Sequence, residues 1–206
     1  MDRTFYYRHI PSPIGPLLLT SRGKALTGLY MTGLEEAAEP RPGVRWIQDD
    51  TVFREIRRQI EAYFDGVSSG FHLALDLAGT AFQRRVWHEL CKIPYGSAIS
   101  YAELARRIGQ PSASRAVGSA NGQNPIAIIV PCHRVIASGG GLGGYGGGLE
   151  RKRWLLEHEA AALARHPEWG VETPAEVSSF TFAGSHEHNN TRFNRQRKLN
   201  PDRLFD

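Results

Sequence analysis

An apolar run from Ile126 to Val130 that ends in a proline is the feature that most constrains what this chain can fold into. Most of its residues are β-branched, and an uninterrupted apolar run of this kind can be buried only as a core strand or core segment. Pro131 has no N–H and cannot extend a helix or a central strand, so the chain must turn there. Cys132 and His133 follow directly. We therefore expect the thiol to lie at the edge of the core, on rigid backbone and pointing outward.

A thiol beside an imidazole is a candidate nucleophile. The reactive form is the thiolate, and the ordinary thiol pKa of roughly 8.5 falls next to an imidazole or a cation such as Arg134. The alternative is that Cys132 is an inert, buried apolar residue and His133 a hydrogen-bonded core residue, as is common for a free cysteine. The pair alone leaves both interpretations open, and the rest of the chain must decide between them.

Composition excludes several classes of protein. The two cysteines, Cys91 and Cys132, are too few for a Cys-rich zinc site, and two thiols in an intracellular chain favour free thiols over a disulfide. His72 is isolated, so we predict no metal site. The first residues carry no signal-peptide core, and no apolar run approaches the ~20 residues that span a bilayer. We expect a soluble, cytoplasmic protein.

Positive charge is concentrated in one part of the chain. Residues 81–160 contain 10 Lys and Arg against 5 Asp and Glu, whereas residues 1–80 contain 9 against 10 and residues 161–206 contain 6 against 6. The net charge of +4 therefore comes from the segment that contains Cys132. A basic segment can be an ordinary solvated face, but beside a candidate nucleophile it suggests a polyanionic partner such as nucleic acid.

The N-terminal and C-terminal regions differ from the middle of the chain. Short β-prone runs at 6–9, 17–20 and 25–30 predict a small antiparallel sheet. Helical spacing predicts a helix over 51–64 with Thr51 as its N-cap, and an extended segment follows at 71–77. This α/β region presents no obvious chemistry and is interpreted as a scaffold. The last forty or so residues are rich in Pro, Ser, Asn and charge, and we expect a partly flexible extension.

The middle region has mostly helical spacing. We predict helices from the cap Thr80 to about residue 93, over 100–109, over 112–121 and over 149–162. The second and third have the spacing of a helix-turn-helix, a pattern that many helical cores share. The third consists of small residues and offers mainly Arg115 and Asn121 as polar side chains. Such a helix suits close approach to a DNA backbone or minor groove better than reading of base edges.

A glycine-rich segment at 138–148 follows the Cys-His turn. It lacks the Gly-Lys-Ser/Thr ending of a phosphate-binding loop, and a flexible loop is the simplest interpretation. Tyr145 within it suggests a pocket wall, where glycine N–H groups could face a ligand with no Cβ in the way. On the helix that follows, Glu159 is the acid that we expect to orient His133, although a glutamate on such a helix is commonly just solvated.

Taken together, these segments resemble the O6-alkylguanine-DNA alkyltransferases, also called methylated-DNA–protein-cysteine methyltransferases. The resemblance covers roughly residues 80–160 without a gap and residues 12–17 more loosely, and it does not extend beyond about residue 165. The motifs that carry it are Pro131-Cys132-His133-Arg134-Val135, Phe82 with Val86-Trp87, Ile93-Pro94-Tyr95-Gly96, Ser100-Tyr101, Arg115-Ala116-Val117-Gly118, Asn124-Pro125, Gly144-Tyr145-Gly146-Gly147-Gly148 and Leu155-Leu156-Glu157-His158-Glu159.

The resemblance implies an α/β (α+β) fold. A ribonuclease-H-like N-terminal domain with a small antiparallel sheet, residues 1–78, would precede a mostly helical catalytic domain, residues 79–163, whose helix-turn-helix binds the minor groove. Residues 164–206 would form the C-terminal extension. The implied partner is double-stranded DNA that contains O6-alkylguanine, with O4-alkylthymine as a further candidate. We expect a monomer, with cooperative binding on DNA left open, and no membrane association.

The same resemblance assigns roles around the thiol. Cys132 is the acceptor, His133 acts as its base through a water molecule, and Glu159 holds the imidazole. Asn124 ties the active-site turn to the helix-turn-helix. Tyr101 pushes on the 3′ phosphate and then donates a proton to the departing base.

At the DNA, Arg115 would enter the base stack in place of the extruded guanine, and Ala116 and Asn121 lie on the same small-residue helix. The physical need is clear, because an alkyl group on O6 is buried in the duplex and the base must be flipped out at a cost on the order of a few kcal/mol. An inserted arginine recovers stacking and adds charge attraction.

Inside the implied pocket, the carbonyls of Cys132 and Val135 would accept from the guanine amine. The N–H of Gly146 would meet O6, and Tyr145 would form a wall. The thiolate would displace the purine from the alkyl carbon, and the resulting thioether carries no easily displaced group. We therefore expect a single-turnover enzyme that needs no cofactor, since the lesion itself brings the alkyl group.

Two rival interpretations remain at the level of sequence. A helix-turn-helix DNA-binding protein without alkyl transfer would leave the Cys-His turn without a purpose. A thiol hydrolase would use the same nucleophile but would turn over repeatedly.

Overall fold

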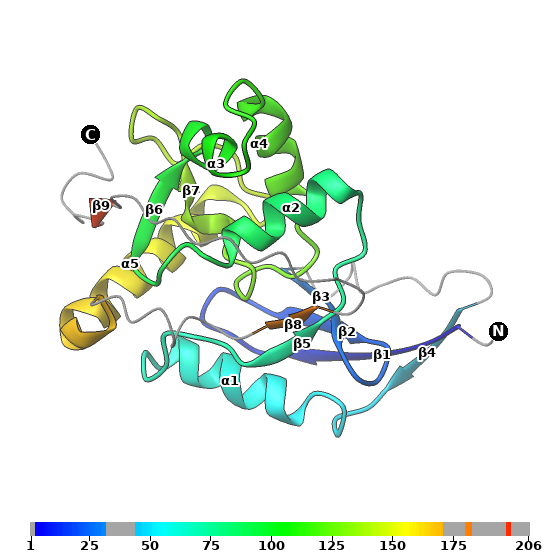
Figure 1. Cartoon of the computed structure of the whole chain (residues 1–206). Helices are drawn as coiled ribbons and strands as arrows, with labels where there is room; N and C mark the ends of the chain where they lie inside the picture. The colour runs from blue at the N-terminus through cyan, green and yellow to red at the C-terminus, as the bar shows by residue number, and fades with distance from the viewer. Residues whose placement is uncertain (1–2, 32–43, 171–179, 183–196, 199–206) are drawn as a thin grey trace.

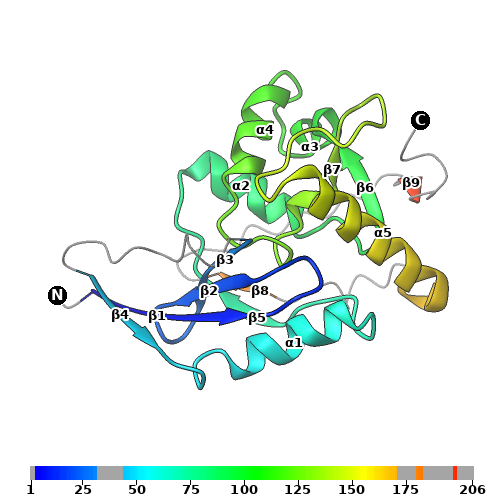
Figure 2. The same cartoon turned by 180° about the vertical axis from the view of Figure 1, so that it is seen from behind.

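The computed structural model describes residues 3–31, 44–170, 180–182 and 197–198 (Figure 1). A β-sheet forms the central layer, with helix α1 on one face and a mostly helical layer over the other (Figures 1 and 2). This is the predicted fold class. The strands are β1 Arg3–Ile10, β2 Leu17–Ser21, β3 Leu26–Tyr30, β4 Val44–Gln48, β5 Leu73–Leu75, β6 Ser97–Ser100, β7 Val135–Ile136, β8 Phe180–Phe182 and β9 Arg197–Lys198. The helices are α1 Arg54–Phe64, α2 Ala81–Leu90, α3 Tyr101–Arg107, α4 Ser114–Gly122, α5 Leu149–Arg165 and the short 3-10 helices η2 Cys132–Arg134 and η3 Pro167–Gly170.

The larger sheet of the described residues has six strands in the order β4-β1-β2-β3-β5-β8. Strands β1, β2 and β3 are antiparallel, as the turn signals between them predict. Strand β4 joins β1, β5 joins β3 and β8 joins β5, all in parallel. The predicted antiparallel sheet is therefore confirmed for β1, β2 and β3, while the parallel pairing at both edges was not predicted. Parallel pairing joins segments that are distant in sequence, so no local turn signal announces it.

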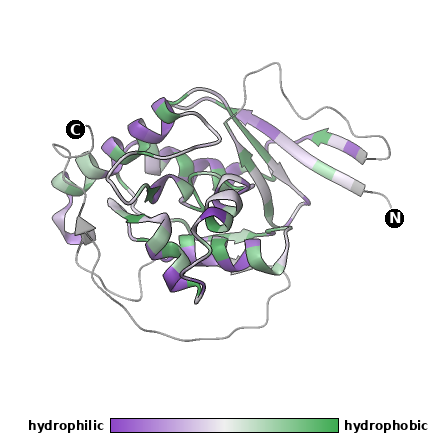
Figure 3. Cartoon of the chain, turned by 90° about the horizontal axis from the view of Figure 1, so that it is seen from above, coloured by the Kyte–Doolittle hydropathy of each residue, from purple (hydrophilic) through white to green (hydrophobic). Residues whose placement is uncertain are grey.

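Helix α1 begins three residues later than predicted. Thr51 is not its N-cap, because the backbone N–H and the hydroxyl of Thr51 both donate to Oδ1 of Asp49, at 2.7 and 2.6 Å. The helix starts at Arg54 without a side-chain cap. Its buried stripe includes Ile56, Ile60 and Tyr63, at the spacing that an amphipathic helix requires. The alternation of apolar and polar residues along the helices is visible in Figure 3.

The helical layer starts with the predicted cap. Thr80 and Gln83 form a reciprocal capping box at the start of α2. The indole of Trp87 on α2 donates to the carbonyl of Ala120 on α4, at 2.8 Å, and fixes these two helices side by side. Between α3 and α4 the chain turns at Gly109, whose φ of +75° favours glycine. Helices α3 and α4 form the predicted helix-turn-helix, with α4 shifted by two residues at its start.

The C-terminal extension is described only in part. Helix α5 continues to Arg165, and η3 follows it. Strand β8 pairs with β5 of the larger sheet, and β9 pairs with β6. The rest of the extension, including the basic side chains Arg192 and Arg195, lies outside the described residues. No helix in the described part of the chain is long and apolar enough to cross a bilayer.

Candidate active site

The run before the cysteine folds into turns instead of a strand. Two backbone hydrogen bonds join the start of this segment to Leu29 of β3. The N–H of Leu29 donates to the carbonyl of Pro125 at 2.9 Å, and the N–H of Ala127 donates to the carbonyl of Leu29 at 3.0 Å. Ile128 then adopts a φ of +69°, which is strained for a β-branched residue by about 1–2 kcal/mol. The segment is thus anchored to the sheet at one end and held in a strained turn at the other.

Two asparagines hold this turn. Asn124 donates from Nδ2 to the carbonyl of Val130 at 2.7 Å, and its Oδ1 accepts from the N–H of Ile126 at 3.0 Å. Asn121, on α4, donates to the carbonyl of Cys132 at 3.2 Å. Asn121 is 3% exposed, so it lies behind the active-site turn and not on the exposed face of α4, where the sequence led us to expect it. Asn121 connects the turn to the helix-turn-helix, whereas the side-chain bonds of Asn124 hold the turn itself together.

Cys132 is buried. It is 5% exposed, at the start of η2, so the prediction that the thiol points outward was wrong. Burial raises its pKa, and the nearby Asn124, Lys152 and Tyr145 oppose the rise only in part. The lowering of the thiol pKa by neighbouring groups, which the sequence suggested, is therefore outweighed by burial. In the resting protein the thiol is neutral, and a base is needed to make it a nucleophile.

His133 is the group that can serve as this base. It is fully buried, and its Nε2 lies 2.8 Å from Oε1 of Glu159. Burial lowers the pKa of His133, and the opposing effect of Glu159 does not overcome it, so the imidazole is neutral near neutral pH. With Glu159 ionised, the Nε2 proton points to the carboxylate and Nδ1 keeps a free lone pair. That Nδ1 is buried and has no hydrogen-bond partner among the described residues.

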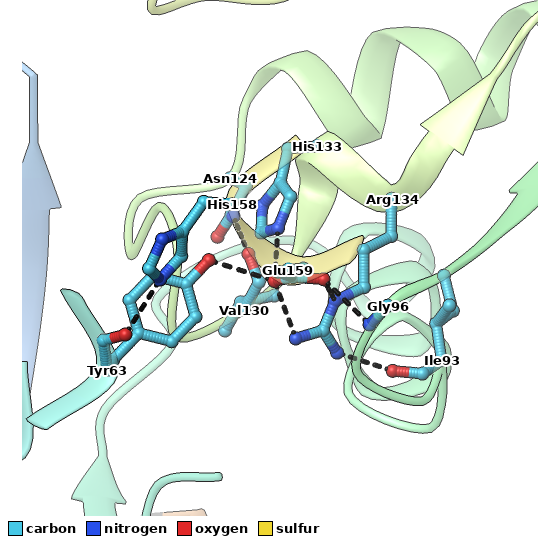
Figure 4. A network of polar contacts seen from close by, with 9 residues as sticks. All are labelled: Tyr63, Ile93, Gly96, Asn124, Val130, His133, Arg134, His158 and Glu159. Carbon is cyan, nitrogen blue, oxygen red and sulfur yellow. Dashed lines mark hydrogen bonds and ion pairs between the residues drawn. The ribbon is translucent and has the colours of Figure 1, made fainter. Parts of the chain in front are cut away.

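Glu159 is the centre of a buried polar network (Figure 4). Its two oxygens accept from Nε and Nη2 of Arg134, both at 2.9 Å, and from the N–H of Gly96 at 3.0 Å. The hydroxyl of Tyr63, on α1, also donates to Oε1, at 2.9 Å. Burial acts to raise the pKa of Glu159, but Arg134 and His133 more than offset it and hold the pKa below its usual range. The carboxylate is therefore ionised, as a base-orienting role requires.

Sequence reasoning missed Lys152. No role was predicted for it, yet Lys152 is fully buried and donates to the carbonyls of Val135 and Leu142. Burial lowers its pKa to about 8, against the effect of Cys132. The signal was present in its spacing, because Lys152 shares one helical stripe with Leu155 and Glu159, both fully buried.

Arg151 ties the glycine-rich loop to the sheet layer. Its guanidinium donates to the carbonyls of Ile14 at 2.8 Å, Met31 at 3.3 Å and Gly147 at 3.1 Å. These carbonyls belong to the β1–β2 turn, the end of β3 and the loop itself. Arg151 and Lys152, adjacent on α5, thus bind carbonyls at two points of the glycine-rich loop. The loop therefore has more fixed contacts than its glycine content suggests.

Two tyrosines approach the thiol from the loop and the helix-turn-helix. Tyr101, the first residue of α3, donates to the carbonyl of Gly144 at 3.2 Å, and burial followed by the nearby Cys132 raises its pKa. The hydroxyl of Tyr145 is buried without a regular hydrogen-bond partner among the described residues, although it is close enough to Cys132 to affect the thiol pKa. Gly146 beside it is exposed.

The two carbonyls predicted to accept from the guanine amine differ in how many hydrogen bonds they already accept. The Cys132 carbonyl already accepts from the N–H of Val135 and from Asn121, which occupies both lone pairs. The Val135 carbonyl accepts from Lys152. Val135 is therefore the better acceptor for an incoming amine. On α4, the predicted DNA residues Arg115 and Ala116 are both exposed.

The described residues contain no group of three or more His, Cys, Asp or Glu side chains that could hold a metal ion. What they bring together is a thiol, a neutral imidazole with a free nitrogen, and an ionised carboxylate, directly behind a helix-turn-helix. Fold and site define a DNA-binding protein with a cysteine nucleophile.

Comparison with known proteins identifies the family. A family model of the 6-O-methylguanine DNA methyltransferase ribonuclease-like domain matches residues 5–77, and that of the DNA-binding domain matches residues 81–161. The chain therefore belongs to the 6-O-methylguanine DNA methyltransferase family, which confirms the resemblance read from the sequence.

Relatives with curated names and solved structures agree. The methylated-DNA–protein-cysteine methyltransferase of Mycobacterium bovis is 55% identical over 154 residues, which cover 75% of this chain and 92% of that protein. The protein of the same name from Methanosarcina barkeri is 50% identical over 155 residues, covering 75% of this chain and 96% of that one. The crystal structure of Mycobacterium tuberculosis OGT in complex with DNA has a TM-score of 0.69 at 52% identity, covering 76% of this chain and 94% of that chain.

Proposed function

We propose that this protein repairs DNA directly, by transferring the alkyl group of O6-alkylguanine in duplex DNA to Cys132, once per protein molecule. The family and its DNA-bound relative support alkyl transfer and DNA as the partner. The observation that carries the assignment to this site is the free Nδ1 of His133, buried next to Cys132 in the chain while Nε2 is held by Glu159.

In the proposed step, His133 takes the proton of the Cys132 thiol at Nδ1 through a water molecule. The sulfur forms a bond to the alkyl carbon while the bond between that carbon and O6 breaks, and the electron pair remains with the purine. Tyr101 donates a proton to the departing guanine and recovers one through solvent from the imidazolium. To do so, its hydroxyl must first release the carbonyl of Gly144. The thioether has no good leaving group, so Cys132 is consumed.

The raised pKa of the resting thiol has a physical use in this scheme. A permanently ionised cysteine is open to oxidation and to reaction with unrelated electrophiles. A buried neutral thiol becomes a nucleophile only when His133 removes its proton. Base and thiol would therefore act together on a base that has entered the pocket, which limits the irreversible step to the lesion.

We further propose double-stranded DNA with O6-alkylguanine as the substrate, and O4-alkylthymine as a second candidate. The protein would act as a monomer, inside the cell where the DNA is. Residues 1–78 would form the scaffold domain, residues 79–163 the catalytic DNA-binding domain and residues 164–206 an extension. The comparisons give no support to a helix-turn-helix protein without alkyl transfer.

Intact-mass spectrometry tests the proposed function. The protein is incubated with a duplex that contains one O6-methylguanine and, in parallel, with the same duplex without the lesion. We expect the mass of one methyl group to be added only in the first sample. An unchanged mass in the presence of the lesion, with DNA bound, would leave the DNA-binding protein without alkyl transfer as the better account.

Arg115→Ala tests the base-flipping role of α4. Because the inserted side chain offsets part of the few kcal/mol that flipping costs, we expect repair of duplex DNA to slow on the order of 10- to 100-fold. Reaction with free O6-benzylguanine, which needs no flipping, should change little. Arg85→Ala removes the same charge from an exposed position on α2 and serves as the matched control. Equal losses on both substrates would remove Arg115 from this role.

A further inference from the structure

We propose that Tyr63, at the C-terminal end of helix α1 where it packs against α5, is a positioning residue for the base of the alkyl-transfer step. It would act through Glu159, so a residue of the N-terminal scaffold would help to set the basicity of His133. The inference rests on the proposed function, in which His133 accepts the thiol proton. Nothing in the motifs around Cys132 points to residue 63, which lies 96 positions before Glu159.

The geometry is specific to one oxygen atom. Oε1 of Glu159 accepts from the Tyr63 hydroxyl at 2.9 Å, from Nε2 of His133 at 2.8 Å and from Nη2 of Arg134 at 2.9 Å. Tyr63 and His133 therefore compete for electron density on the same atom. A change at the tyrosine must alter how strongly that oxygen attracts the imidazole proton.

Tyr63 is held so that its hydroxyl cannot turn away. The side chain is fully buried, and its ring packs against those of Phe71 and Tyr95, with centroid distances of 5.5 and 5.9 Å. Its backbone carbonyl lies 2.8 Å from Nε2 of His158, next to Glu159 on α5. Burial, and then the charge of Glu159, raises the pKa of the Tyr63 hydroxyl well above its usual value. The phenol is thus a neutral donor throughout the working range of pH.

The direction of the effect follows from the sharing of Oε1. Without the Tyr63 hydroxyl, Oε1 carries more negative charge and holds a protonated His133 more strongly, so the pKa of His133 rises. A smaller fraction of His133 is then neutral at mildly acidic pH, and the base is lost earlier as the pH falls. Other charged or titratable groups that act on this pair come from η2, the α2–β6 turn, the glycine-rich loop and α5, and a Tyr63 variant leaves them in place. They are Arg134, Tyr95, Tyr145 and Lys152, and His158 contacts the backbone of Tyr63 itself.

The chain offers a matched control. Tyr95 is buried beside Tyr63, but its hydroxyl has no hydrogen-bond partner among the described residues. Tyr95→Phe and Tyr63→Phe therefore remove the same atom from neighbouring buried rings. Only Tyr63→Phe removes a bond to Glu159.

The experiment compares the rate of alkyl transfer as a function of pH for wild type, Tyr63→Phe and Tyr95→Phe. We expect the acid side of the profile to move up by about one pH unit in Tyr63→Phe and to stay in place in Tyr95→Phe. A loss of stability alone would lower the amount of active protein but would not move the profile. Coinciding profiles for the three proteins would overturn the inference.

A second measurement separates this inference from the proposed function. The pKa of His133 is followed by NMR in the free proteins, with no substrate present, and should be higher in Tyr63→Phe than in wild type and Tyr95→Phe. If wild type forms no methyl adduct, the proposed function fails, while the NMR titration still decides the link from Tyr63 to His133. An unchanged His133 pKa in a folded Tyr63→Phe protein would refute that link.

Discussion

Cys132→Ala takes up no alkyl group from duplex DNA that contains O6-methylguanine. The expected loss of transfer rate exceeds about 10³-fold, because no other atom in the site can replace the nucleophile. Folding should be preserved, since the change removes only the buried sulfur atom and leaves intact the hydrogen bonds from the side chains of Asn121 and Asn124 to the carbonyls of Cys132 and Val130. The variant should still bind the duplex through the helix-turn-helix. Intact-mass spectrometry and a DNA-binding assay on the same sample measure both results.

Cys91→Ala is the matched control for this prediction. Cys91 is the second free thiol, at the end of α2, and burial raises its pKa to about 12. No base comparable to His133 contacts it in the described part of the chain, so its loss should leave transfer unchanged. A methyl adduct on the Cys132→Ala protein, or the absence of the adduct from the Cys91→Ala protein, would show that the acceptor has been assigned to the wrong sulfur.

Glu159→Gln lowers the free energy of unfolding by about 3–5 kcal/mol, the usual cost of leaving one member of a buried ion pair without its partner. The uncompensated charge is that of Arg134, which is 7% exposed. Glutamine also places an NH₂ group where the carboxylate accepts bonds, facing the N–H of Gly96 or the hydroxyl of Tyr63. Alkyl transfer should fall as well, because His133 loses the group that fixes its tautomer. Urea unfolding gives the change in stability.

Glu157→Gln removes the same charge two residues away. Glu157 is exposed on α5, and an exposed substitution of this kind changes stability by no more than about 0.5 kcal/mol. A Glu159→Gln protein as stable as Glu157→Gln would mean that the network in Figure 4 contributes little to folding. The role of Glu159 would then have to rest on chemistry alone.

Local signals in the sequence predicted local structure well. Thr80 was correctly predicted as the cap of α2, where its partner Gln83 is only three residues away, and the helix predicted to end at Gly109 ends just before it, since helices commonly terminate at such a glycine. Thr51 satisfied the same kind of rule and was wrong, because Asp49 competes for its hydrogen bonds. The parallel edges of the sheet involve residues far apart in the chain and were missed.

The features of the site likewise divide into those that the sequence predicted and those that depend on tertiary packing. The cysteine, histidine and glutamate followed from the motif and its resemblance to a family. The state of the thiol did not, because its pKa depends on burial by segments from several parts of the chain. The buried position of Lys152 was not predicted, because a charged side chain is rarely buried, although its spacing matched the buried stripe of α5. Tyr63 could not be found at all, since only the packing of α1 against α5 brings it to Glu159.

The most direct test of the account counts the lesions repaired by each protein molecule. A known amount of protein is mixed with a large excess of duplex containing O6-methylguanine, and the unrepaired lesion is measured until the reaction stops. Irreversible consumption of Cys132 predicts a plateau at one lesion removed per molecule of active protein. Continued repair beyond one equivalent would mean that the thiol is regenerated, as in a hydrolase, and would contradict the central claim.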